Sequence, residues 1–121
     1  MGVLSPLHSV CFCIDLLNWP ICHLPVLVNY LITTLIQADD IIWIHDYHMI
    51  PMARDLRRLG VKNRIGFFLH TPWPVRQLLV TLPHHRRLVE AMFDYDLIGF
   101  QTREWLDLFR DYVASEPSVR P

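Results

Sequence analysis

The sequence predicts an α/β fold in which short parallel strands alternate with helices. From Asp39 onward, three mainly apolar runs at residues 41–44, 64–69 and 97–100 are separated by segments whose apolar residues have helical spacing. The first run contains only isoleucine and tryptophan, which is typical of a strand covered on both faces. Strands and helices that alternate in this way favour βαβ units and a parallel sheet.

A helix is expected immediately before the first run. Its apolar residues recur at the i, i+3, i+4, i+7, i+8 spacing of one buried helix face. The apolar stretch around it, residues 24–36, is about 13 residues long, and a bilayer requires roughly 18 to 20. A transmembrane span is therefore not expected. The predicted buried face consists of Val28, Leu31, Ile32, Leu35 and Ile36.

The next helix is expected from about Pro51 to Leu59. Proline suits the first turn of a helix, and Gly60 suits the left-handed position after the last turn. The predicted buried face comprises Met52, Leu56 and Leu59.

The segment after the second run is expected to be a loop, because Pro72 and Pro74 prevent ladder or helix bonding there. A short helix should then end at Leu82, before Pro83, and another should run from about His84 to Tyr95. The predicted buried residues of this second helix are Leu88, Ala91, Met92 and Tyr95.

A last helix follows the third run, and its predicted buried face contains Trp105, Leu108, Phe109, Tyr112 and Val113. The chain thus divides into an irregular segment at residues 1–27, an α/β domain at 28–114 and a tail at 115–121. Prolines interrupt any period in the first segment, and the polar tail is expected to fray.

The composition excludes several classes of partner. The formal net charge is −1, so no general field attracts nucleic acid or an anionic membrane. The three cysteines, Cys11, Cys13 and Cys22, are odd in number and fit no zinc spacing, which favours reduced thiols. The first residues lack the basic region of a secretory leader. A cytoplasmic location is therefore expected.

Polar residues follow each of the three apolar runs, at residues 45–48, 70–71 and 101–102. Ligands of open parallel sheets bind beyond the carboxyl ends of the strands. A single His or Asp at such a position often only caps the next helix. Three such clusters together favour a site for a polar ligand.

Two residues in these clusters have chemistry that suits a polar ligand, whose identity the residues alone do not give. The Asp46 carboxylate can accept hydrogen bonds from two vicinal hydroxyls. His70 can donate to a hydroxyl or, when protonated, stabilise negative charge on a leaving phosphate. No metal site is expected, because His45 and His48 are three residues apart and not four. The four glycines are isolated, so no glycine-rich phosphate loop is present.

Three sequence blocks resemble the signatures of the trehalose-6-phosphate synthase family, a retaining glycosyltransferase group (family 20). They are Ile-Ile-Trp-Ile-His-Asp-Tyr-His at 41–48, Ile-Gly-Phe-Phe-Leu-His-Thr-Pro-Trp-Pro at 65–74 and Tyr-Asp-Leu-Ile-Gly-Phe-Gln-Thr at 95–102. Their order and spacing match the family, as does Leu82-Pro83. The resemblance covers roughly residues 39–112.

The resemblance implies a two-domain GT-B enzyme that transfers glucose from UDP-glucose to glucose 6-phosphate. This chain would supply a partial Rossmann-like parallel sheet from the N-terminal half. Asp46 would bind the acceptor glucose 6-phosphate, and the catalytic His70 would reach the donor glucose. The remaining expected pocket-lining residues are His45, Tyr47, His48 and Thr71.

The family's front-face mechanism lets the leaving phosphate take the acceptor proton, so no paired carboxylates are needed. The resemblance implies no metal ion and no cofactor, since UDP-glucose is the donor substrate. The full-length enzyme is expected to be compatible with a homo-oligomer.

The chain departs from the family pattern in places. Trp73 stands where the family usually has Phe, and Val75 replaces what is often a small polar residue. The donor loop, an early arginine and the second domain have no counterpart, so a fragment is expected. The isolated chain should be inactive, because half a site loses about 7 kcal/mol or more of the proximity contribution. Two alternatives remain: a non-catalytic sugar-phosphate-binding remnant, or a related glycosyltransferase with another phosphorylated acceptor such as glycerol 3-phosphate.

Overall fold

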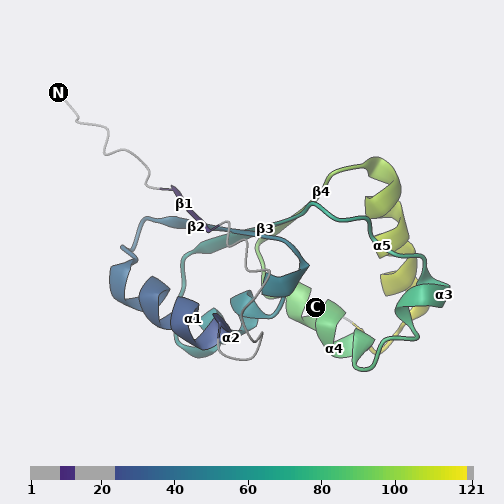
Figure 1. Ribbon diagram of the computed structural model, residues 1–121, viewed down its shortest axis with the longest axis horizontal. Helices are drawn as coiled ribbons and strands as arrows, with labels where there is room; N and C mark the ends of the chain where they lie inside the picture. The colour runs from purple at the N-terminus through teal and green to yellow at the C-terminus, as the bar shows by residue number, and fades with distance from the viewer. Residues whose placement is uncertain (1–8, 13–23, 120–121) are drawn as a thin grey trace.

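The computed structural model describes residues 9–12 and 24–119. Within them the strands form one parallel sheet in the order β1-β2-β3-β4. The expected α/β class with a parallel sheet is therefore confirmed (Figure 1). The strands are β1 (Ser9–Phe12), β2 (Ile41–His45), β3 (Arg64–Leu69) and β4 (Leu97–Phe100).

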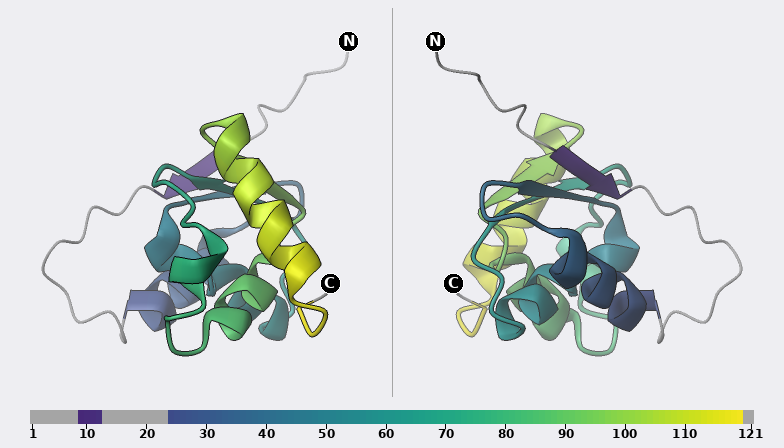
Figure 2. Two further views of the ribbon diagram at one scale, coloured as in Figure 1. Left: turned by 90° about the vertical axis from the view of Figure 1, so that its right-hand side faces the viewer. Right: turned by 90° about the vertical axis from the view of Figure 1, so that its left-hand side faces the viewer.

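The helices cover one face of this sheet and one of its ends. Helices α1, α2 and α4 lie on the same face, whereas α3 and α5 lie at the β4 end (Figure 2). No helix in the described ranges is both long and apolar enough to cross a membrane. The helices are α1 (Leu24–Leu35), the 3₁₀ turn η1 (Tyr47–Met49), α2 (Met52–Arg58), α3 (Arg76–Leu79), α4 (His85–Met92) and α5 (Arg103–Ser115).

The covered face of the sheet forms the core. In a strand, alternate side chains point to opposite faces, and parallel register keeps paired residues on the same face. Ile42 pairs with Ile65, Ile44 pairs with Phe67, and all four side chains are buried. The helices contribute the other side of this core, including Met52, Leu56, Val89 and Met92.

The opposite face carries aromatic rings lying over glycines. Trp43 pairs with Gly66, and a Cβ added at Gly66 would overlap the Trp43 ring. Phe68 pairs with Gly99, where an added Cβ would lie 2.6 Å from a ring carbon of Phe68. Trp43 and Phe68 are only half-buried. Residues 41–44, which form β2, were expected to be covered on both faces. That expectation is wrong for the described residues, because their helices pack on the other face of the sheet and at its β4 end (Figure 2).

The predicted helix faces are wrong at two positions. In α1, Leu35 is 72% exposed, whereas Ile32 is buried as predicted and Asn29 is buried in addition. Val28 and Leu31 lie outside the described side chains. Because α1 is apolar on most sides, hydrophobicity alone does not define which face packs on the sheet. Leu59 is 58% exposed, since α2 ends at Arg58. The expected left-handed glycine after this helix is confirmed by the φ of 86° at Gly60.

The N-terminal segment differs from the expectation of irregularity. Strand β1 lies within residues 1–27, and α1 begins at Leu24 and not near residue 28. A four-residue strand is too short to reveal a period of two, which explains why the sequence does not predict it. The remainder of that prediction, including Cys13 and Cys22, concerns residues outside the described part.

The tail is docked and not frayed as far as Val119. Val119 is fully buried, and the Glu116 carboxylate lies 2.9 Å from Arg76 and 3.1 Å from Arg86. Burial alone would raise the pKa of Glu116, but the hydrogen bonds and charges of these two arginines outweigh it and lower that pKa. The carboxylate therefore ties the end of α5 to α3 and α4.

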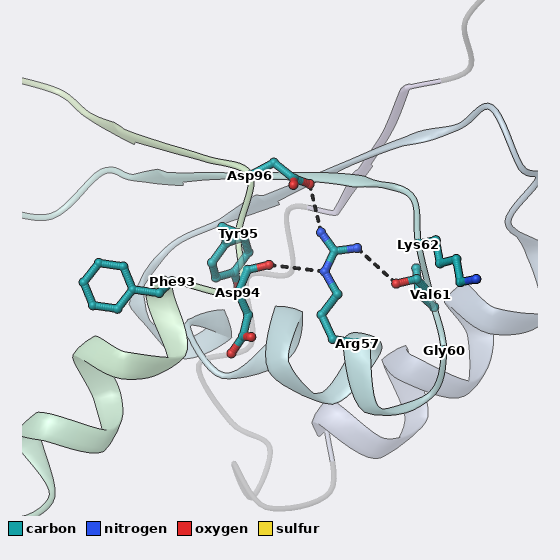
Figure 3. Close-up of a pocket in the computed structure, with 8 residues that line it drawn as sticks. All are labelled: Arg57, Gly60, Val61, Lys62, Phe93, Asp94, Tyr95 and Asp96. Carbon is teal, nitrogen blue, oxygen red and sulfur yellow. Dashed lines mark hydrogen bonds and ion pairs between the residues drawn. The ribbon is translucent and has the colours of Figure 1, made fainter. Parts of the chain in front are cut away.

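Arg57 connects three segments at the amino edge of the sheet (Figure 3). Its guanidinium donates to the carbonyls of Val61 at 3.0 Å and Asn63 at 2.7 Å, and it pairs with the Asp96 carboxylate at 2.8 Å. The same Asp96 oxygen accepts the Ile65 N–H at 2.7 Å. The polar groups of Arg57, Val61, Asp94 and Asp96 that line the adjacent hollow of about 560 Å³ bond within this network. We assign this network to stability.

Replacing Gly66 with Ala should lower the free energy of unfolding by about 1–3 kcal/mol, because the added methyl overpacks the Trp43 ring. Urea unfolding of Gly66→Ala, Trp43→Val and the double variant measures this cost. The cost of Gly66→Ala should shrink once the ring is removed. An equal cost in both backgrounds would contradict the contact.

Candidate active site

The parallel pairing of β2 and β3 brings two predicted site residues into contact. His45 is the last residue of β2, and His70 follows the last residue of β3. His45 Nδ1 lies 2.9 Å from His70 Nε2, and the rings are stacked with centroids 5.1 Å apart. Residues 25 positions apart in the chain thus form a hydrogen-bonded imidazole pair.

Each imidazole of this pair lies against an aromatic ring two residues earlier. His45 packs edge-to-face on Trp43, with ring centroids 5.8 Å apart. His70 contacts Phe68, with ring centroids 4.8 Å apart. The two aromatic residues were not predicted as part of the site. Their period-two spacing from the histidines is the sequence signal that places them on the same face of the sheet.

Asp46 has a strained backbone at the same edge of the sheet. Its φ is 71° and its ψ is 156°, a region that is almost exclusive to glycine. Its N–H donates to the Phe68 carbonyl at 3.0 Å, and its own carbonyl accepts the Met49 N–H at 3.0 Å. These two hydrogen bonds hold the conformation between β3 and η1.

The Asp46 side chain contains an unsatisfied acceptor. Its Oδ1 atom is buried and has no hydrogen-bond partner within the described ranges. Leaving a buried acceptor unpaired costs about 1–3 kcal/mol, and more when the group is charged. A ligand hydroxyl that donates to this oxygen would remove the cost. The strain and the unpaired oxygen therefore coincide on the residue that the sequence predicts to bind the acceptor.

The other predicted pocket-lining residues, Tyr47, His48 and Thr71, differ in exposure and in contacts. Tyr47 is 51% exposed, and its ring lies 3.7 Å, centroid to centroid, from that of His48, which is also exposed. Thr71 is half-buried and directly follows His70. All three belong to the loops after β2 and β3, but only Tyr47 and His48 contact each other by a described interaction.

The third strand-end cluster has a local role. The Thr102 hydroxyl accepts the Trp105 N–H at 3.2 Å and so caps α5. Gln101 is exposed. The capping alternative therefore holds for this cluster, and the site is built from the ends of β2 and β3. Trp73, which departs from the family pattern, is 4% exposed and packs against Phe100 and Phe109 in the core.

The electrostatic environment disfavours a charged His45. Burial lowers its pKa below the usual 6.5, and the His70 charge lowers it further, while the Asp46 carboxylate partly opposes both. In the described part of the chain, no group of three or more His, Cys, Asp or Glu is arranged to hold a metal ion. The arrangement suits hydrogen bonding to a ligand with hydroxyl groups.

Comparison with known proteins gives one consistent family. The family model for glycosyltransferase family 20 matches residues 29–115. The chain is 51% identical over 82 residues to the trehalose-6-phosphate synthase of Enterobacter sp. (strain 638), covering 68% of this chain and 17% of the relative. It is 38% identical over 116 residues to that of Sinorhizobium fredii, covering 81% and 25%.

Solved structures agree with this similarity. A UDP-forming trehalose-phosphate synthase from Burkholderia xenovorans superposes with a TM-score of 0.75 at 48% identity, covering 78% of this chain and 21% of the other. A structure from the same organism in complex with glucose-6-phosphate gives 0.76 at 46% identity, covering 84% and 24%. These superpositions confirm the expected fold class. The chain spans about a fifth of the length of these relatives.

Replacing Asp46 with Gly should raise the free energy of unfolding by about 1 kcal/mol. Glycine adopts the observed φ and ψ without strain. The strain energy that is removed exceeds the cost of the extra conformational entropy that glycine gives the unfolded chain. Asp46→Asn keeps the Cβ atom and should not reproduce the gain. Urea unfolding of both variants measures the effect, and a destabilised Asp46→Gly would contradict the strain.

The free energy of unfolding should fall as the pH decreases from 6.5 toward 5. The pKa of His45 is lower in the folded chain than in the unfolded chain, so on acidification the unfolded chain binds a proton at His45 first. The stability that neutral His45 contributes is therefore present above pH 6.5 and is lost as the pH falls through the folded pKa. Unfolding midpoints across this range should vary less in His45→Asn. An unchanged pH slope in that variant would exclude His45 as the source.

Proposed function

Because the chain belongs to glycosyltransferase family 20, we propose that it forms the acceptor-side part of a trehalose-6-phosphate synthase. The reaction is transfer of glucose from UDP-glucose to glucose 6-phosphate with release of UDP. The names of the relatives support this assignment, as does the solved relative in complex with glucose-6-phosphate. A further structure, of the Escherichia coli enzyme bound with UDP-2-fluoro glucose, supports the donor class.

The observation that carries the proposal is the state of Asp46. Its carboxylate sits on a strained backbone, with one oxygen buried and unsatisfied within the described residues, at the carboxyl edge of a parallel sheet. Strain of this kind persists where the surrounding structure enforces it and is concentrated at functional sites. Paired hydroxyl donors on a hexose match a carboxylate acceptor. We therefore assign Asp46 to the hydroxyls of glucose 6-phosphate.

The neighbouring residues extend this assignment. His70 is exposed and bonded to His45, the residue before Asp46, and in the proposal it meets the donor glucose. His45, Tyr47, His48 and Thr71 line the pocket in the proposal. The leaving phosphate takes the acceptor proton on the same face, so the chain needs to supply orientation and hydrogen bonds, but no carboxylate nucleophile.

The proposal also covers partners and location. The ligands are a sugar phosphate and a nucleotide sugar, with no metal ion and no separate cofactor. The net charge of −1 supports the absence of a nucleic-acid partner. We propose a cytoplasmic protein that forms homo-oligomers in its full-length form.

The test is a nuclear magnetic resonance titration of the purified chain with glucose 6-phosphate. Saturable shifts are expected near Asp46 and His70. Asp46→Asn should weaken binding at least about 10-fold, because hydrogen bonds to a charged group contribute about 1.5–3 kcal/mol. Asp107→Asn, on an exposed position of α5, is the matched control and should bind like the wild type.

A well-dispersed spectrum without saturable shifts would refute the acceptor site. Equal affinity for glycerol 3-phosphate would instead support a related glycosyltransferase with another acceptor. Binding without UDP release when UDP-glucose is added is expected, since most of the relatives' length has no counterpart in this chain.

A further inference from the structure

The hydrogen bond between the two imidazoles constrains both rings. His45 Nδ1 and His70 Nε2 are 2.9 Å apart, so one of these nitrogens carries a proton and the other accepts it. Two protonated nitrogens facing each other at this distance would repel, and two unprotonated ones would form no bond. The contact therefore permits only defined combinations of tautomers.

The consequence falls on the second nitrogen of His70. If His45 donates, His70 must carry its proton on Nδ1 and presents a donor there. If His70 donates from Nε2, its neutral ring presents an acceptor at Nδ1. In either case Nε2 is occupied by His45, and Nδ1 is the nitrogen of His70 that remains for a ligand, since the described residues offer it no partner.

The surroundings restrict the His45 ring more than the His70 ring. His45 belongs to β2, is half-buried and packs edge-to-face on Trp43. His70 lies in the loop after β3, is exposed and contacts Phe68. The half-buried ring of β2 is therefore the one better placed to orient the exposed ring of His70.

We propose that His45 is a positioning residue for His70: its Nδ1 couples the tautomer of the His70 imidazole to its own, holds the pair in one of the two permitted combinations and directs His70 Nδ1 toward the sugar substrate. This inference rests on the proposed function for the identity of the ligand. It assigns His45 an action through His70 and not a direct contact with the sugar. The direct evidence is the hydrogen bond, the nearly parallel ring planes at 21° and the different anchoring of the two rings.

Among the described residues, the electrostatic influences on His45 come from His70 and Asp46. From the loop after β2, the Asp46 carboxylate is the charged group that acts on His45. The sheet contributes the uncharged rings of Trp43 and Phe68. The lowered pKa of His45 keeps it neutral and thus able to accept.

The experiment measures the ring ¹⁵N signals of His70 in the purified 121-residue chain without ligand. A single tautomer gives two well-separated ¹⁵N signals, whereas a tautomer mixture brings them together. The wild type should show separated signals. His45→Leu should move them toward each other, because it removes the hydrogen-bonding nitrogen.

Two variants provide the controls. His45→Asn places an amide near the position of Nδ1 and should retain the separated signals. His84→Asn changes an exposed histidine with a left-handed backbone, φ 61°, which asparagine tolerates. It lies outside the site and should leave the His70 signals unchanged.

The outcomes separate this inference from the proposed function. Averaged His70 signals in the wild type, or unchanged signals in His45→Leu, would overturn the inference without any ligand. Addition of glucose 6-phosphate and UDP-glucose should then shift His70 Nδ1 more than Nε2. If other site signals shift but Nδ1 does not, the inference is overturned. If no sugar binds while the tautomer result stands, the proposed function fails and the role of His45 in fixing the tautomer survives.

Discussion

The parallel pairing of β2 with β3 is the constraint on which the rest of the site depends. Strands that run in the same direction end at the same edge of a sheet, so the loops that follow them emerge side by side. His45 and His70 meet for this reason alone. A shift of one residue in register would turn each side chain to the other face and would separate the pair. The covered face opposes such a shift, because it buries Ile42 and Phe67.

The amino and carboxyl ends of the strands differ in how well their polar groups are satisfied. At the amino edge, Arg57 and Asp96 join α2 to the starts of β3 and β4 through hydrogen bonds that leave few polar groups unsatisfied. At the carboxyl edge, Asp46 has strained dihedral angles and an unpaired buried oxygen. Asn29 Oδ1 and Trp73 Nε1 are also buried without a partner among the described residues, but only Asp46 combines an unpaired atom with a strained backbone. A stability of about 5–15 kcal/mol for a typical domain tolerates a few such costs.

The face of the sheet that the described helices leave open supports the two histidines. Glycines at positions 66 and 99 let Trp43 and Phe68 lie across the neighbouring strands. These rings then support the imidazoles at the strand ends. The preorganised part of the site therefore extends down the strands as a layer of packed rings. This layer rests on regular secondary structure, which holds side chains more accurately than a loop does.

The sequence alone determined the α/β class and most of the helices, and it predicted polar clusters at three strand ends, because apolar runs, prolines and a helix-ending glycine act over a few residues. Only the tertiary structure decided features that depend on distant atoms. It turned α1 so that Leu35 is exposed, made Thr102 a helix cap, and docked the tail through Glu116. It also produced the strain at Asp46. A pattern of neighbouring residues reports which backbone conformations are favourable, but not which partner will compensate an unfavourable one.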